Sequence, residues 1–161
     1  MSVLDAAVQA ARESGDYAAL LSALPYARYV GMHAELEDGV VRLSLPFKPT
    51  LVGNTRLPAF HGGVVGALLE SAALLQLIHQ RGLPFPKTID FTVDYLRMAR
   101  AETLFAVAEV QRAGRRIANV RMRAYQSLER EPVALGRGNF LLGLLRAPER
   151  VAEEDPQQGG Q

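Results

Sequence analysis

Residues 60–81, with the sequence FHGGVVGALLESAALLQLIHQR, decide the fold of this chain. Between residues 64 and 75 the only polar side chains are Glu70 and Ser71. A helix that is apolar on every side lies in the core of a protein or spans a membrane. Glu70, Ser71 and Gln76 interrupt a run that is barely long enough to cross a bilayer, which takes about 20 apolar residues. We therefore predict a buried central helix and no membrane partner.

Glu70 lies in the middle of this predicted helix, where an unpaired carboxylate is costly to bury. Catalysis is the simplest reason to tolerate that cost, with Glu70 as a base or a nucleophile. Gly62 and Gly63 open the helix, and free amides at a helix N-terminus suit a polarised carbonyl oxygen, as in an oxyanion hole. The glycine pair could equally be a turn. His61 could be a helix cap or an orienting donor.

The spacing of these groups constrains the site. Gly62 and Glu70 are eight residues apart in the sequence. On a helix this is about 12 Å along the axis. A reacting carbonyl must lie within about 3 Å of both the oxyanion donor and the catalytic group. We therefore expect a homodimer with two antiparallel central helices and two shared active sites.

The rest of the chain predicts a helical lead-in followed by strands. Apolar positions at helical spacing predict a helix over 2–14, and Asp16 can cap a second helix that ends before Pro25. Asp-Gly at 38–39 is a hairpin signal, and the proline-rich residues 46–60 are typical of an irregular loop. We expect strands at 32–36, 40–45, 88–96, 103–111, 116–126 and 133–144.

These elements predict an α+β fold in which an antiparallel β-sheet wraps around the long central helix. Because short turns join the last four strands, we expect them to form a meander. We predict an N-terminal helical extension at 1–30 that packs on the outside, a main domain at 31–146 and a disordered tail at 147–161.

Composition excludes several classes of function. The chain has 161 residues, enough for one domain, and its formal net charge of +1 gives no reason to expect a nucleic-acid partner. It has no cysteine and three histidines, none spaced as a metal-ligand pair on a helix, so we expect no metal site. The N-terminus lacks the long apolar segment of a secretory signal, and we expect a cytoplasmic protein.

The chain resembles the hotdog-fold acyl-CoA thioesterases of the phenylacetate-pathway type over residues 32–144. Three features carry this resemblance. Asn54 precedes His61-Gly62-Gly63, and Glu70 follows His61 by nine residues. The stretch TIDFTVDYLR at 88–97 is similar to the family's tyrosine-containing strand. Gly114-Arg115 and VALGRG at 133–138 are similar to its following turn and last strand.

The resemblance implies hydrolysis of an acyl-CoA thioester, with coenzyme A present as part of the substrate and no other cofactor. It assigns Glu70 and Thr88 to one subunit, and Asn54, His61, Gly62 and Gly63 to the other, in a homotetramer built as a dimer of dimers. Many relatives have Asp at the position of Glu70, which leaves water activation and direct attack both open. The interval from Asn54 to His61 is about one residue longer than in some relatives.

Three arginines at strand ends are candidate ligands for the coenzyme A phosphates: Arg97, Arg115 and Arg116. A solvated sheet edge is the other interpretation of these residues. Two other functions stay open: a non-catalytic acyl-CoA-binding protein of the same fold, and a dehydratase or hydratase, which would need a catalytic histidine that only His61 could supply.

Overall fold

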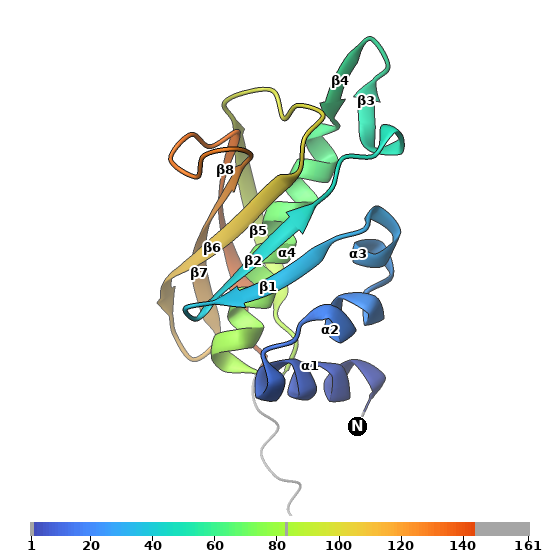
Figure 1. Ribbon diagram of the computed structural model, residues 1–161. Helices are drawn as coiled ribbons and strands as arrows, with labels where there is room; N and C mark the ends of the chain where they lie inside the picture. The colour runs from blue at the N-terminus through green and yellow to red at the C-terminus, as the bar shows by residue number, and fades with distance from the viewer. Residues whose placement is uncertain (1, 83, 144–161) are drawn as a thin grey trace, which may run out of the picture.

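The computed structural model describes residues 2–82 and 84–143 (Figure 1), so the predicted tail at 147–161 lies outside the described residues. The elements are, in chain order, α1 (Val3–Ser14), α2 (Ala18–Ala23), α3 (Pro25–Val30), β1 (His33–Glu37), β2 (Val40–Leu45), the 3₁₀ turn η1 (Pro49–Leu51), β3 (Val52–Asn54), β4 (Leu57–Phe60), α4 (Gly62–Arg81), β5 (Lys87–Tyr95), β6 (Leu104–Ala113), β7 (Ile117–Tyr125) and β8 (Ala134–Leu141).

The main sheet has six strands in the order β1-β2-β6-β7-β8-β5, and every neighbouring pair in it is antiparallel. The long helix α4 packs against one face of this sheet, mainly against β6, β7 and β2 (Figure 1). A separate small sheet, β3-β4, projects beyond the body next to the first turn of α4 (Figure 1). The predicted fold, an antiparallel sheet around a long central helix with helices at the N-terminus, is confirmed.

The core forms where the sheet meets α4. Alternate residues of β6 and β7 point at the helix, and many of them are alanines, which let the helix approach closely. Leu68, Leu69 and Leu77 of α4 are fully buried. Burying a leucine side chain is worth about 2 kcal/mol. α4 has the length and mean hydropathy of a membrane span, but more than half of that window is buried inside the fold, so it is the core helix.

The predicted meander is correct for β6, β7 and β8 and wrong for β5. Strand β5 pairs with β8, the last strand of the described residues, with Phe91 opposite Gly138 and Tyr95 opposite Ala134. It does not pair with β6, which follows it in the chain. As a result β5 is an edge strand of the sheet, as β1 is at the opposite side.

Two further segments differ from the predictions. Residues 46–60 are not an irregular loop throughout, because they contain η1 and the pair β3–β4, in which Val52 lies opposite Phe60. Pro25 ends the second helix as expected, but it also begins α3, where its fixed φ suits the first turn of a helix.

The N-terminal helices contribute to the core, whereas the sequence predicted that they pack outside it. Tyr17, Leu20 and Leu21 are buried and belong to the main hydrophobic cluster. The Tyr17 hydroxyl lies 2.7 Å from His79 Nδ1, and the Arg12 Nε donates to the His79 carbonyl at 3.2 Å. Burial raises the pKa of Tyr17. These contacts attach α1 and the start of α2 to the last turns of α4.

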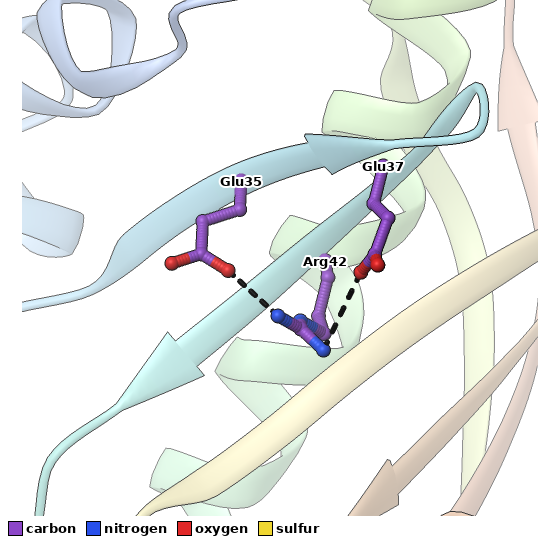
Figure 2. A network of polar contacts seen from close by, with 3 residues as sticks. All are labelled: Glu35, Glu37 and Arg42. Atoms are coloured by element: carbon purple, nitrogen blue, oxygen red, sulfur yellow. Dashed lines mark hydrogen bonds and ion pairs between the residues drawn. The ribbon is translucent and has the colours of Figure 1, made fainter.

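The outer face of the sheet carries a cluster of charged side chains near the β1 edge. Arg42 of β2 lies between two carboxylates of β1, 2.7 Å from Glu35 and 3.6 Å from Glu37 (Figure 2). Its guanidinium also lies over the ring of Phe105 on β6. Exposed ion pairs of this kind contribute little stability, about 1 kcal/mol or less. Their presence shows that this face is compatible with water, whereas the opposite face holds the helix.

Gln76 is a buried polar side chain of α4, 3% exposed, and it joins the helix to the β1–β2 turn. Its Oε1 accepts from the Val41 amide at 2.8 Å, and its Nε2 donates to the Gly39 carbonyl at 3.0 Å. We expect Gln76→Met to lower the free energy of unfolding by about 1–3 kcal/mol, because both backbone groups lose their partner. Urea denaturation measures this change. Gln80→Met, on an exposed position of the same helix, is the control and should leave stability nearly unchanged.

Candidate active site

Glu70 and Thr88 meet where α4 crosses β5. The Thr88 hydroxyl donates a hydrogen bond to Glu70 Oε1 at 2.6 Å, and both side chains are half-buried. The register of β5 against β8 shifts between Thr88 and Asp90. A β-bulge adds one residue to a strand and re-aims the side chains beside it. In a regular strand, side chains an odd number of residues apart point to opposite faces. Thr88 and Phe91 are three residues apart, yet both face α4, because the register shift lies between them.

The structure differs from the prediction that Glu70 is buried in the middle of a fully covered helix. Glu70 is half-buried, and so are four residues that run along the same side of α4: Val64, Ala67, Ser71 and Leu74. Their spacing of three and four residues makes one continuous line on a helix. We call these four residues the open stripe. Glu70 lies beside the open stripe and can be reached from that side of the helix.

His61 caps the N-terminus of α4. Its Nδ1 accepts a hydrogen bond from the Gly63 amide at 2.9 Å. In the neutral imidazole, the proton must then be on Nε2, which makes that nitrogen a donor. The cap uses the Gly63 amide, whereas the Gly62 amide has no hydrogen-bond partner within residues 2–82 and 84–143. Of the two predicted oxyanion donors, Gly62 is therefore the one with a free N–H.

Two residues near the helix start were not assigned a role from the sequence. Tyr95 of β5 donates its hydroxyl to the Gly62 carbonyl at 2.7 Å. Gly53 of β3 packs on His61 so closely that an added Cβ would lie 2.8 Å from the His61 ring. A tyrosine in a strand gives no local sign of such a bond. The glycine could have been suspected, because glycine inside a strand often marks a close approach.

Asn54 lies next to Gly53 in the β3–β4 hairpin. Its Oδ1 accepts from the Arg56 amide at 3.0 Å, which is the bond of a turn residue, and its side chain is exposed. The predicted site residues thus form two groups in one chain. Thr88 contacts Glu70. The β3–β4 hairpin, which carries Asn54, contacts His61 through Gly53. Because α4 runs unbroken from Gly62, the two groups stay about 12 Å apart along its axis.

The structure does not bring the three candidate arginines together in one chain. Arg97 follows β5 at the end where Tyr95 contacts Gly62, and it lies 3.9 Å from Glu131. Arg115 and Arg116 lie in the β6–β7 turn, directly after Ala113, whose carbonyl accepts from Arg81 at the other end of α4. A helix of this length extends about 30 Å, so the two groups lie at opposite ends of the molecule.

Other features of the described chain do not compete with this site. A hollow of about 660 Å³ lies on the outer face of the sheet, between residues such as Arg42, Arg121 and Tyr125, and Glu70 is not among the residues that line it. Within residues 2–82 and 84–143, no three His, Asp or Glu side chains are grouped so that they could hold a metal ion.

Comparison with known proteins gives a consistent result. A family model described as the acyl-CoA thioesterase N-terminal domain matches residues 54–141, more than half of the chain. The medium/long-chain acyl-CoA thioesterase YigI of Escherichia coli is 30% identical over 135 residues, which covers 74% of this chain and 86% of that protein.

Two solved structures show the same fold. A protein of Chromobacterium violaceum is 40% identical, with a TM-score of 0.70, and the match covers 86% of this chain and 97% of that one. The Escherichia coli PaaI protein from the phenylacetic acid degradation operon is similar in fold, with 20% identity and a TM-score of 0.62 over 74% of this chain and 84% of that one. The expected resemblance is confirmed, and the chain belongs to the acyl-CoA thioesterase family.

Proposed function

We propose that this protein hydrolyses an acyl-CoA thioester to a free acid and coenzyme A. The observation that carries the proposal is the Thr88–Glu70 hydrogen bond of 2.6 Å, which holds a carboxylate beside the open stripe of the central helix. Membership of the acyl-CoA thioesterase family supports the same reaction. In this proposal the reaction needs no metal and no cofactor other than the coenzyme A of the substrate, and it takes place in the cytoplasm.

In the proposed reaction, the thioester carbonyl approaches the free Gly62 amide, which stabilises the negative charge that develops on its oxygen. Glu70 either takes a proton from a water molecule that attacks the carbonyl carbon, or attacks that carbon itself. In the water route, the carbon–sulfur bond breaks as the proton that Glu70 took passes to the sulfur, so coenzyme A leaves as its thiol and the acid carries the oxygen of water. In the direct route, the carbon–sulfur bond breaks as an acyl–Glu70 anhydride forms, and water then cleaves this anhydride to release the acid, restore the Glu70 carboxylate and supply the proton of the thiol. Thr88 holds one carboxylate oxygen, and the other is free to react.

The two halves of this site come from different subunits in the proposal. Strand β5 is an edge of the sheet, and Ile89 and Tyr95 on it are 52% and 56% exposed. An unpaired edge next to apolar side chains favours pairing with another chain. If a second copy pairs along β5 with its α4 antiparallel, its Gly62 approaches the Glu70 of the first copy. The proposed homotetramer is a dimer of such dimers.

This dimer also accounts for the separated arginines. Arg97 lies at one end of the molecule along α4, and Arg115 and Arg116 lie at the other end. When the two α4 helices are antiparallel, Arg97 of one chain comes beside Arg115 and Arg116 of the other. The three side chains could then contact one coenzyme A molecule through its phosphates. For the acyl group we propose a medium or long apolar chain. The name of the relative YigI supports this choice, as does the apolar character of the open stripe.

The first test is thiol release from short-, medium-, long-chain and aromatic acyl-CoAs by the wild-type protein and by Glu70→Gln. We expect the variant to lose about two or more orders of magnitude in kcat, because the amide can neither accept the proton nor attack. Glu109→Gln, an exposed carboxylate on β6, is the matched control and should keep wild-type turnover. Binding of acyl-CoA without turnover by the wild type would instead identify a binding protein.

The Thr88 hydroxyl is tested with a pair of variants. Thr88→Val keeps the shape of the side chain but removes the donor to Glu70, and we expect it to lower kcat roughly tenfold, in line with the loss of a hydrogen bond to a charged group. Thr88→Ser keeps the hydroxyl and should retain most of the activity. Equal kcat values for the valine variant and the wild type would contradict the proposed role of Thr88.

The shared site is tested by Ala67→Arg, which places a charge in the middle of the open stripe. We expect sedimentation velocity to show a monomer, because an unpaired charge in an apolar interface is costly, and we expect turnover to fall with the loss of the dimer. Val3→Arg adds the same charge at a position of α1 that is 83% exposed, and it should change neither property. A fully active wild-type monomer would rule out a site shared between subunits.

A further inference from the structure

We propose that Tyr95 is a positioning residue for thioester hydrolysis and that each β5 strand thereby supports halves of two different active sites. The inference rests on the proposed function and on the shared site. Thr88, near the beginning of β5, holds the Glu70 carboxylate. Tyr95, the last residue of the same strand, holds the first turn of α4 through the Gly62 carbonyl.

The contact between Tyr95 and the helix start is close and specific. Its hydroxyl donates to the Gly62 carbonyl at 2.7 Å. A Cβ added to Gly62 would lie 3.3 Å from Tyr95 Cζ, and one added to Gly66 would lie 3.6 Å from the Tyr95 hydroxyl. The ring therefore lies along the glycine side of the helix. A methyl group at position 62 would crowd the ring, which would have to move by a few tenths of an ångström.

The bond from Tyr95 acts on the peptide group that joins Gly62 to Gly63. The oxygen of this peptide accepts from Tyr95, and its N–H donates to His61 Nδ1 at 2.9 Å. A donor on the carbonyl oxygen polarises the peptide and strengthens the bond that its N–H makes. Tyr95 thus helps to hold His61 in the form with its proton on Nε2. It also fixes the direction of the neighbouring Gly62 amide, the proposed oxyanion donor.

Within its own chain, Tyr95 does not contribute to the buried core, so its hydroxyl bond to Gly62 is the contact that needs an explanation. The residue is 56% exposed, and it is not part of the buried hydrophobic cluster. Phenylalanine could occupy the same position with the same ring. The hydroxyl is therefore the part of the side chain whose loss should affect the reaction, and its removal should leave the fold intact.

The two bonds made by one β5 serve different sites in the proposed dimer. Thr88 supports the Glu70 of its own chain, and that carboxylate faces the partner's helix start. Tyr95 supports the Gly62 of its own chain, and that amide faces the partner's carboxylate. A defect in Tyr95 and a defect in Glu70 of the same chain therefore fall in different active sites.

The first experiment compares Tyr95→Phe with the wild type on an acyl-CoA that the wild type hydrolyses. We expect kcat to fall about three- to tenfold, the loss of one hydrogen bond, with KM changed less than about twofold. Tyr29→Phe removes an exposed phenol on α3 and should match the wild type. Gly62→Ala should also lower kcat because its methyl group crowds the Tyr95 ring, whereas Gly66→Ala makes ordinary contacts and should retain activity.

The second experiment uses mixed dimers, prepared by coexpression of two differently tagged chains, one with Glu70→Gln and one with Tyr95→Phe. In the proposed arrangement one of the two sites is fully wild type, so the mixed dimer should have about half of the wild-type kcat. If Tyr95 instead acts on the Glu70 of its own chain, the mixed dimer should reach about half of the kcat of the Tyr95→Phe homodimer.

The outcomes separate the inference from the proposed function. A wild-type protein without thioesterase activity overturns the proposed function and the inference with it. An active wild type whose Tyr95→Phe variant has an unchanged kcat overturns the inference alone. A mixed dimer with only about half of the kcat of the Tyr95→Phe homodimer also overturns the inference. Equal circular dichroism spectra and urea unfolding curves for Tyr95→Phe and the wild type exclude loss of folding as the cause of a lower kcat.

Discussion

The constraint that shapes this protein is the need to remove the 20-residue apolar helix α4 from water. A sheet of six strands covers one side of the helix, and alanines on β6 and β7 let the two surfaces approach closely. The N-terminal helices cover its last turns. What the single chain leaves half-covered is the open stripe and Glu70 beside it. The carboxylate therefore lies where a single chain leaves the central helix half-covered.

Of the six strands, β5 makes the contacts that hold the candidate site residues of α4. It is an edge of the sheet, and two of its inward side chains, Thr88 and Tyr95, form hydrogen bonds with α4. The bulge between Thr88 and Asp90 allows Thr88 and Tyr95 to face the helix together. A regular strand would direct one of them to the outer face, because side chains alternate with a period of two. One irregularity in the ladder thus fixes both ends of the proposed catalytic arrangement.

Much of the fold could be predicted because its signals are local. The apolar run of α4, the Asp-Gly turn of the first hairpin and the alternation of β6 and β7 each belong to a short window of sequence. The position of β5 could not be predicted in this way. Its alternation resembles that of β6, and the choice of β8 as its neighbour depends on contacts about 50 residues apart in the chain, which no local pattern encodes. The hairpin β3–β4 was missed because its glycine and proline, Gly53 and Pro58, resemble those of a loop.

The candidate site shows the same division between local and long-range information. Gly62, Gly63 and Glu70 could be selected from spacing alone, because all three lie on one helix. Spacing could not decide between the two amides. That distinction depends on the rotamer of His61, whose Nδ1 takes up the Gly63 N–H. Tyr95 could not be found locally either, because its partner is a backbone oxygen 33 residues earlier in the chain. The sequence of a helix can therefore identify candidate reacting groups, whereas their orientation is set by residues that the fold brings from elsewhere.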